Sequence, residues 1–136
     1  MREVGSRLAD KLIFDELAFF AKVKQRPGMY LGKKSLLSLR DQLFGMTFAF
    51  SACGHPDALY YFTTFIETYN KQLLELDGNG YACWWNHLIY TSGNCDNLAF
   101  DAFYTNFESY LKREYQLTLP TEFSSKAKKE NETGRG

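Results

Sequence analysis

A chain of 136 residues has room for one domain around a single hydrophobic core. Its 16 Lys and Arg balance its 16 Asp and Glu, and no stretch of about 18 apolar residues could serve as a membrane span. Residues 1–10 are charged and lack an apolar run, so we expect no secretory signal and a cytoplasmic location. The aromatic share, 17% of residues, is large enough for Phe, Tyr and Trp to fill the core.

The cysteines give no sign of a metal centre. Cys53, Cys83 and Cys95 are an odd number of thiols without a Cys-x-x-Cys spacing, which predicts neither a zinc site nor a disulfide framework. We therefore expect no metal and no other cofactor.

The first predicted helix begins at Asp15, which can cap a helix start, with Glu16 favourable in the first turn. It must end near Arg26, because Pro27 disfavours helical geometry in the residue before it and the glycine that follows permits a turn. Its apolar stripe holds Leu17, Phe20 and Ala21 together with Lys24. Residues 12–14 either extend this helix or form a separate apolar entry segment.

The second predicted helix has Ser35 as its N-cap and ends at the Gly-His-Pro run of residues 54–56. Its stripe advances by three and four residues over about four turns, through Leu36, Leu39, Leu43, Met46 and Phe50. Gly45 lies inside this helix at a cost of about 1 kcal/mol relative to Ala. We therefore expect a neighbouring helix to approach closely at Gly45.

Two more predicted helices follow. Asp57 opens the third, whose stripe contains Ala58, Phe62, Phe65, Tyr69 and Leu73, widened by Leu59 and Ile66. Residues 77–80 are a strong loop signal, Asp-Gly-Asn-Gly. The fourth helix covers about residues 81–91, with Trp84 and Leu88 facing inward.

The fifth predicted helix is capped by Asp96. One face is marked by Ala99, Phe103, Phe107, Tyr110 and Glu114, and it is broadened by Phe100, Tyr104 and Leu111. Val and Ile are scarce and no alternating run appears, which disfavours strands. We predict an all-α, compact bundle of four to five helices over residues 8–119, followed by a disordered polar tail over residues 120–136.

Charge is unevenly distributed along the chain. Residues 22–40 carry six basic side chains and no acid, namely Lys22, Lys24, Arg26, Lys33, Lys34 and Arg40. Residues 41–108 carry only Lys71 as a base, against the acids Asp41, Asp57, Glu67, Glu75, Asp77, Asp96, Asp101 and Glu108. An acidic surface attracts basic proteins and repels nucleic acid, although such charges also serve simply to solvate helix faces.

The run Lys24-Gln25-Arg26-Pro27-Gly28-Met29-Tyr30-Leu31-Gly32 resembles a segment near the amino end of the gyrase ATPase domain. In that family the next helix carries a catalytic glutamate and a magnesium-binding asparagine. Here residues 35–52 contain neither Glu nor Asn, and no Gly-rich phosphate cradle follows. The sequence therefore argues against an ATPase.

A second resemblance covers about residues 15–111. The chain is similar to small all-α bacterial proteins with an RPGMYLG-x-x-SL motif, through Phe20, Arg26–Gly32, Ser35-Leu36, Leu39, Gly45, Phe62, Phe65, Trp84, Leu88-Ile89, Asp96, Ala99, Phe103 and Phe107. That family includes proteins resembling the immunity proteins of polymorphic-toxin and contact-dependent growth inhibition systems. The resemblance implies a binding protein, not an enzyme, that neutralises a cognate toxin domain, for instance a nuclease, by occluding its active site.

An acidic inhibitor surface would suit the basic groove of a nuclease. The candidate contacts are Glu67, Glu75, Asp77, Asp101 and Glu108, while we expect Asp96 to be a helix cap. Tyr60, Tyr61 and Tyr104 are either exposed anchors for a partner or ordinary core residues, the commoner role. In the family motif we expect Arg26 to bond free helix carbonyls and Tyr30 to pack over the turn.

Two alternatives remain open from the residues. The basic segment 22–40 could contact nucleic acid, although no helix-turn-helix spacing or interleaving with aromatics supports this. Cys83 and His87 share one helix face and could form a catalytic pair, but a buried cysteine beside a surface histidine is far more common.

Overall fold

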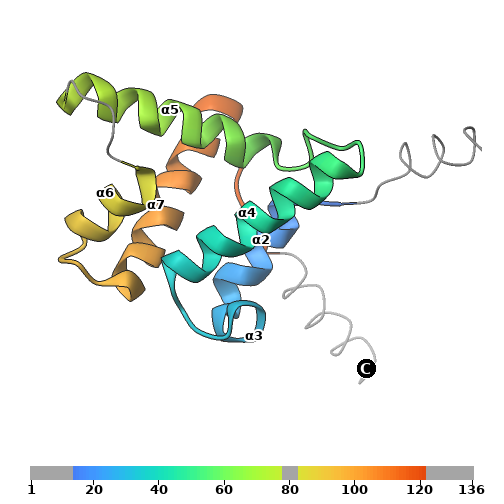
Figure 1. Cartoon of the computed structure of the whole chain (residues 1–136), viewed down its shortest axis with the longest axis horizontal. Coiled ribbons are helices and arrows are strands. Elements are labelled where there is room, and N and C mark those ends of the chain that lie inside the picture. Colours follow the sequence, from blue (N-terminus) through green and yellow to red (C-terminus); the bar gives the residue numbers. More distant parts are fainter. Residues whose placement is uncertain (1–13, 78–82, 122–136) are drawn as a thin grey trace, which may run out of the picture.

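The computed structural model describes residues 14–77 and 83–121, and the regular structure in these two stretches is entirely helical (Figure 1). In chain order the helices are α2 (Glu16–Gln25), α3 (Pro27–Leu31), α4 (Leu36–Ala52), α5 (Tyr60–Asp77), α6 (Trp84–Thr91) and α7 (Asp96–Tyr115). The predicted all-α class is confirmed, with one short extra helix, α3. Residues 8–13 of the predicted domain, and the predicted tail from residue 122 onward, lie outside the described residues.

Local capping sets the start of the fold. The Asp15 carboxylate accepts a hydrogen bond from the Ala18 N–H at 3.1 Å and so caps α2, as predicted. After α2 the sequence predicts only a turn, but the chain forms the single-turn helix α3, because proline suits the first position of a helix. Gly32 ends α3 with a φ of 82°, a left-handed conformation that glycine adopts without strain.

The first half of α4 is held in the core. Ser35 is its N-cap, and its hydroxyl oxygen accepts a hydrogen bond from the Ser38 N–H at 3.0 Å. The predicted stripe is confirmed in its direction. Its first three members are fully buried and its last two are half-buried, in the order Leu36, Leu39, Leu43, Met46 and Phe50.

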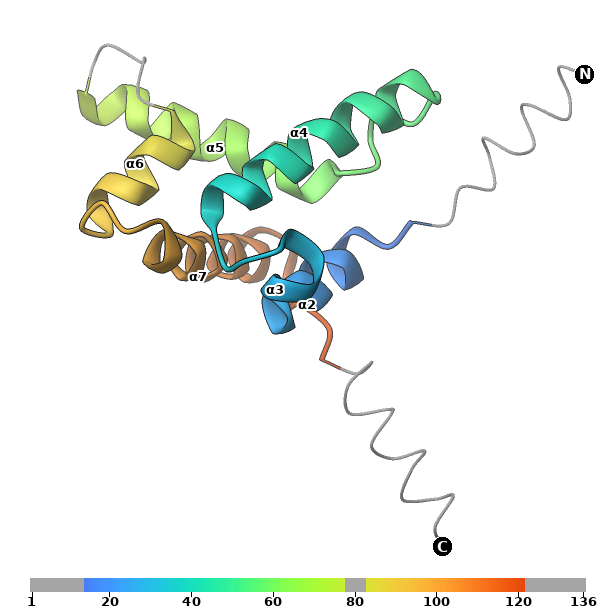
Figure 2. The same ribbon diagram turned by 60° about the horizontal axis from the view of Figure 1, so that its bottom comes forward.

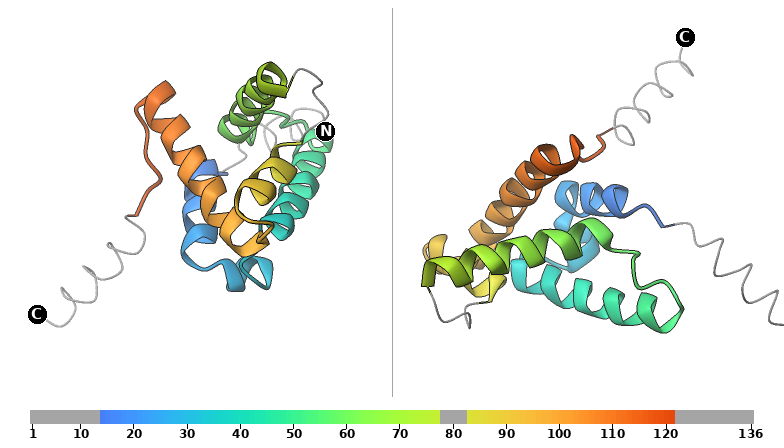
Figure 3. Two further views of the ribbon diagram at one scale, coloured as in Figure 1. Left: turned by 90° about the vertical axis from the view of Figure 1, so that its left-hand side faces the viewer. Right: turned by 90° about the horizontal axis from the view of Figure 1, so that it is seen from above.

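The second half of α4 stands away from the body. α4 and α7 start beside each other and then diverge along their lengths (Figures 2 and 3). Gly45 is exposed, and a Cβ atom built on it would meet nothing within 4 Å. The predicted close approach of a neighbouring helix at Gly45 is therefore wrong among the described parts of the chain.

α5 and α6 follow the predicted pattern, but both begin later than predicted: α6 begins at Trp84 rather than near residue 81. Asp57 lies in the turn before α5, which begins only at Tyr60. The inward residues of both helices are buried, namely Phe62, Phe65 and Leu73 of α5 and Trp84 and Leu88 of α6.

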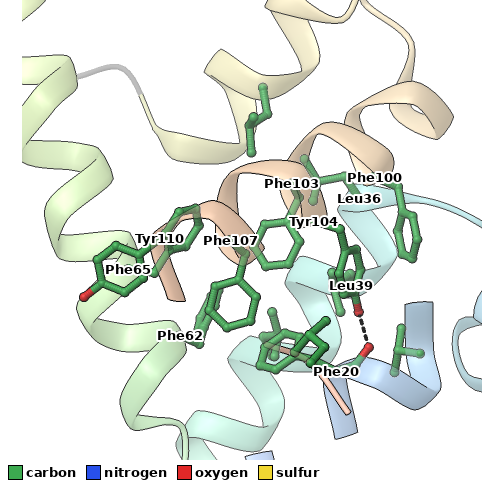
Figure 4. Packing of buried hydrophobic residues seen from close by; sticks show 14 of the residues in the cluster. Phe20, Leu36, Leu39, Phe62, Phe65, Phe100, Phe103, Tyr104, Phe107 and Tyr110 are labelled. Carbon is green, nitrogen blue, oxygen red and sulfur yellow. Dashed lines mark hydrogen bonds between the residues drawn. The ribbon is translucent and has the colours of Figure 1, made fainter. Parts of the chain in front are cut away.

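The centre of the fold is α7, which packs against α4, α5 and α6. Seven of its side chains are buried: Ala99, Phe100, Phe103, Tyr104, Phe107, Tyr110 and Leu111. Figure 4 shows Phe20 of α2 and Phe62 of α5 gathered around Phe103 and Phe107. The ring centroids of Phe20 and Phe107 lie 4.8 Å apart, and those of Phe103 and Phe107 lie 5.5 Å apart in a stacked arrangement. The core is thus aromatic, as the composition predicts.

Candidate interaction surfaces

The two acidic candidates on α7 form ion pairs within the chain. Asp101 Oδ2 lies 2.8 Å from Lys34 Nζ, and Glu108 Oε2 lies 2.5 Å from Lys24 Nζ. Both lysines belong to the basic segment 22–40. The predicted acidic and basic surfaces therefore neutralise each other in part, and neither carboxylate offers an uncompensated charge to a partner.

The acidic candidates on α5 are exposed, but a basic side chain lies near them. Glu67 and Glu75 both face solvent, and exposed Lys71 lies one helical turn from each. The ammonium group of Lys71 offsets part of the negative charge of this face. Asp77 is the last residue of α5, and its side chain lies outside the described residues.

Asp96 caps a helix, but not the one predicted. Its Oδ2 accepts a hydrogen bond from the Ser35 hydroxyl, and its Oδ1 accepts one from the Leu37 N–H at 3.0 Å. These bonds serve the amino end of α4, whereas the N-cap of α7 is Cys95, which makes no side-chain cap bond. Asp96 therefore ties the starts of α4 and α7 together.

Tyr104 is not a surface anchor, and that prediction is wrong. Its side chain is 2% exposed, and its hydroxyl donates a hydrogen bond to the Phe20 carbonyl at 2.7 Å (Figure 4). Burial, and secondarily the charge of Glu108, raise the pKa of Tyr104 well above its usual value. The core alternative is correct, because the wide inward face of α7 includes this position.

Tyr60 and Tyr61 belong to a tyrosine cluster that also contains Tyr110 and Tyr115. The ring centroids of Tyr61 and Tyr115 lie 5.0 Å apart, and those of Tyr60 and Tyr61 lie 5.5 Å apart. Hydrogen bonds from Thr64 and from the cluster's own hydroxyls lower the pKa of Tyr115. Tyr60 remains 48% exposed, so this cluster offers an aromatic edge to solvent.

Beside the tyrosine cluster lies a hollow of about 690 Å³, which we call the acidic hollow. It is lined by Phe14, Asp15, Glu16, Leu17, Asp57, Ala58, Tyr60, Tyr61 and Leu117. Three of these residues are acids and none is Lys or Arg. The fold creates the hollow by bringing the start of α2 against the turn that precedes α5.

Glu16 forms the floor of this arrangement and is only 7% exposed. Its two carboxylate oxygens accept hydrogen bonds from the N–H groups of Tyr61, at 2.9 Å, and Phe62, at 2.6 Å. Glu16 therefore caps α5 from a distant part of the chain. Burial raises its pKa from 4.5 to about 7, against the opposing effect of these two backbone bonds.

This hollow could not be predicted from the sequence. Glu16 is predicted only to favour the first turn of its own helix, and Asp57 only to open the next one. Each acid has a sufficient local explanation, and nothing in the local pattern brings residue 16 next to residue 61. The one available signal is the weak start of α5, where the sequence offers no capping side chain at residue 59.

Half of the basic segment is already engaged. Lys24 and Lys34 pair with α7, and the Arg40 guanidinium lies 2.8 Å from Asp41 and over the Trp85 ring. Lys22, Arg26 and Lys33 are exposed. Tyr30 is 44% exposed, and its packing over the turn stays a prediction.

His87 faces a tyrosine. The Tyr69 hydroxyl lies 2.7 Å from His87 Nδ1, and burial raises the pKa of Tyr69 to about 12. Cys83 is the N-cap of α6, and its carbonyl accepts a hydrogen bond from the His87 N–H at 2.9 Å. A cysteine hydrolase would place an Asn or Asp against the second ring nitrogen of its histidine. This geometry gives no support to the enzyme alternative.

Within residues 14–77 and 83–121, no group of three His, Cys, Asp or Glu side chains is placed to hold a metal ion. None of the helices described there is both long enough and apolar enough to cross a membrane. Comparison of the chain with protein-family models, curated proteins and solved structures found no match.

Proposed function

We propose that this protein binds and neutralises a toxin domain, and that the acidic hollow with its tyrosine edge is the surface that receives a basic side chain of that partner. The observation that carries the proposal is the composition of the hollow, which places the exposed carboxylates of Asp15 and Asp57 beside two tyrosine rings, with no lining lysine or arginine. The inhibitory role is supported by the resemblance to immunity-like proteins over residues 15–111.

The chemistry of the hollow fits a cationic group. A carboxylate attracts Lys or Arg, and a tyrosine face adds a cation–π contact of about 0.5–1 kcal/mol at an exposed site. Tyrosine is also enriched among the residues that contribute most to binding at protein interfaces. Exposed Asp57 and Tyr60 lie at the rim, where an incoming side chain meets them first.

A toxin that acts on nucleic acid has a basic substrate groove. Insertion of one of its lysines or arginines into the hollow would align the inhibitor over that groove and keep the substrate out. The nucleic-acid alternative has less support, because three of the six basic residues in segment 22–40 are engaged with Glu108, Asp101 and Asp41.

The test is co-expression with candidate toxic domains, beginning with any that is encoded immediately upstream, followed by pull-down and growth rescue. We expect rescue and a stable complex for the natural chain. Asp57→Lys and Tyr60→Ala should each weaken binding by at least about tenfold, because one repels the incoming cation and the other removes the ring beneath it. Glu67→Lys is the matched control, since it places the same charge change on an exposed site outside the hollow.

Two results would contradict the proposal. Absence of both rescue and complex would remove the toxin-binding role for this pair of proteins. Rescue that survives Asp57→Lys but fails with Glu67→Lys would keep the role and move the binding surface to α5.

A further inference from the structure

The outer face of α4 is apolar and largely uncovered by the described parts of the chain. We define it as Phe44, Gly45, Phe48, Ala49 and Ala52, all of which are exposed. The Phe48 side chain is 79% exposed and that of Phe44 is 49% exposed. Contiguous exposed apolar side chains of this kind are a common feature of surfaces that bind a partner.

The charge pattern narrows what can bind there. From residue 42 to residue 56 the sequence contains no Asp, Glu, Lys or Arg. A strongly basic or acidic partner would gain nothing from this face and would lose the hydration of its own charges. The occupant must therefore offer an equally uncharged, apolar surface.

Gly45 adds a second observation. A glycine inside an exposed helix is destabilising relative to alanine, and no described neighbour uses the space left by its missing side chain. Phe44 meets the edge of Trp85, with ring centroids 5.6 Å apart, on the flank next to α6. The Gly45 position is open, so it leaves a depression beside the two rings.

We propose that a second copy of this chain packs against the outer face of α4. At about 100° per residue, Phe44 and Phe48 lie along one side of the face, and Gly45 and Ala49 lie along the other. A two-fold axis running along α4 would place the rings of each copy over the small residues of its partner. Such an interface is self-complementary, as a symmetric dimer requires.

Charge is consistent with self-association. The chain has no net charge, with 16 basic and 16 acidic residues, so two copies do not repel each other at long range. The exposed parts of the two rings amount to on the order of 500 Å² for a pair of copies. This is less than a standard interface, so we expect a weak dimer that forms only as the concentration rises.

The experiment is sedimentation equilibrium of the full chain over concentrations of about 1 to 500 μM. The weight-average mass should rise from 15.7 kDa towards twice that value. Phe48→Asp should weaken association at least about tenfold, because it places a charge in the apolar contact. Gly45→Leu should do the same by filling the depression. Leu98→Asp is the control, because Leu98 is 55% exposed on α7, outside the outer face.

A monomeric mass at every concentration would overturn the proposal. The occupant of the outer face would then have to be sought in residues 1–13 or in another protein. So would a Phe48→Asp variant that associates like the natural chain. Circular dichroism of each variant verifies that the helices are retained. The outer face shares no residue with the acidic hollow, so the two proposals can be tested separately. A monomeric Phe48→Asp variant should still rescue growth from the toxin if the acidic hollow is the toxin-binding surface.

Discussion

Helices α4 and α7 are both rich in phenylalanine, yet they place their rings differently. α7 buries Phe100, Phe103 and Phe107, because it lies against three other helices. α4 buries only its first half, and beyond Leu43 its outward rings meet solvent. Aromatic content alone therefore does not decide burial. The surroundings of each helix do: among the described residues, the second half of α4 extends beyond its neighbours.

The largest test of this difference compares Phe103→Ala with Phe48→Ala. Phe103 is fully buried and its ring meets Phe62, Phe65, Trp84 and Phe107, so its loss should lower the free energy of unfolding by about 3–5 kcal/mol. Phe48→Ala should change it by less than about 0.5 kcal/mol. Urea denaturation at low micromolar concentration, where association is negligible, measures both. Equal losses would show that the second half of α4 is covered within the monomer.

The enclosed side of the molecule also contains a buried carboxyl group, that of Glu16, whereas the open half of α4 contains no acidic or basic residue. Glu16 has a pKa of about 7 when folded and 4.5 in its ordinary state. Between these values the folded chain holds a proton that the unfolded chain has released, so stability falls as the pH rises through this window. The loss should reach about 3 kcal/mol by pH 7 and then level off.

Chemical denaturation at a series of pH values between 4 and 8 measures this loss. Glu16→Gln should flatten the slope, because the amide does not titrate. Asp57→Asn is the control on the exposed rim of the same hollow, and it should leave the slope intact. Stability that rises with pH over this range in the natural chain would mean that Glu16 remains ionised, with its cap bonds to α5 outweighing the cost of burial.

Much of this contrast could be predicted from the sequence. The spacing of Leu36, Leu39 and Leu43 identifies the buried side of α4, and the wide stripe of α7 identifies its central place. The exposure of Gly45 could not be predicted. The periodicity of apolar residues identifies the side of a helix that faces inward, but not how far the neighbouring helices extend along it. Likewise α3 follows a proline that permits either a turn or a first helical position.

The candidate site was less predictable than the fold. A sequence pattern shows that Glu67 and Glu75 face solvent, but ion pairs such as that of Asp101 with Lys34 depend on which helix ends meet. Tyr104 could be either core or surface by its chemistry, and only the width of the α7 interface decides that it is core. A hollow formed by residues far apart in the sequence, as at Glu16 and Tyr61, is set by tertiary packing.

A smaller loss of stability is expected from a substitution at the starts of α4 and α7, where the two helices lie side by side. Asp96→Ala removes the acceptor for the Ser35 hydroxyl and the Leu37 N–H, so it should destabilise the fold by about 1–2 kcal/mol. Asn97→Ala, at the exposed neighbouring position, should have an effect below about 0.5 kcal/mol. Thermal unfolding of both variants measures the difference. If they behave alike, the starts of the two helices are held by apolar packing rather than by this cap.

The smallest expected effect lies on the exposed side of α7. The Lys24–Glu108 pair is 50% and 33% exposed, so its coupling free energy should be only about 0.2–1 kcal/mol and should decrease with added salt. A double-mutant cycle with Lys24→Met and Glu108→Gln isolates this coupling from the effect of each substitution alone. A small coupling would mean that a toxin could draw Glu108 away from Lys24 at little cost. A coupling above about 2 kcal/mol would instead make Glu108 a structural residue and exclude it as a contact for the proposed toxin partner.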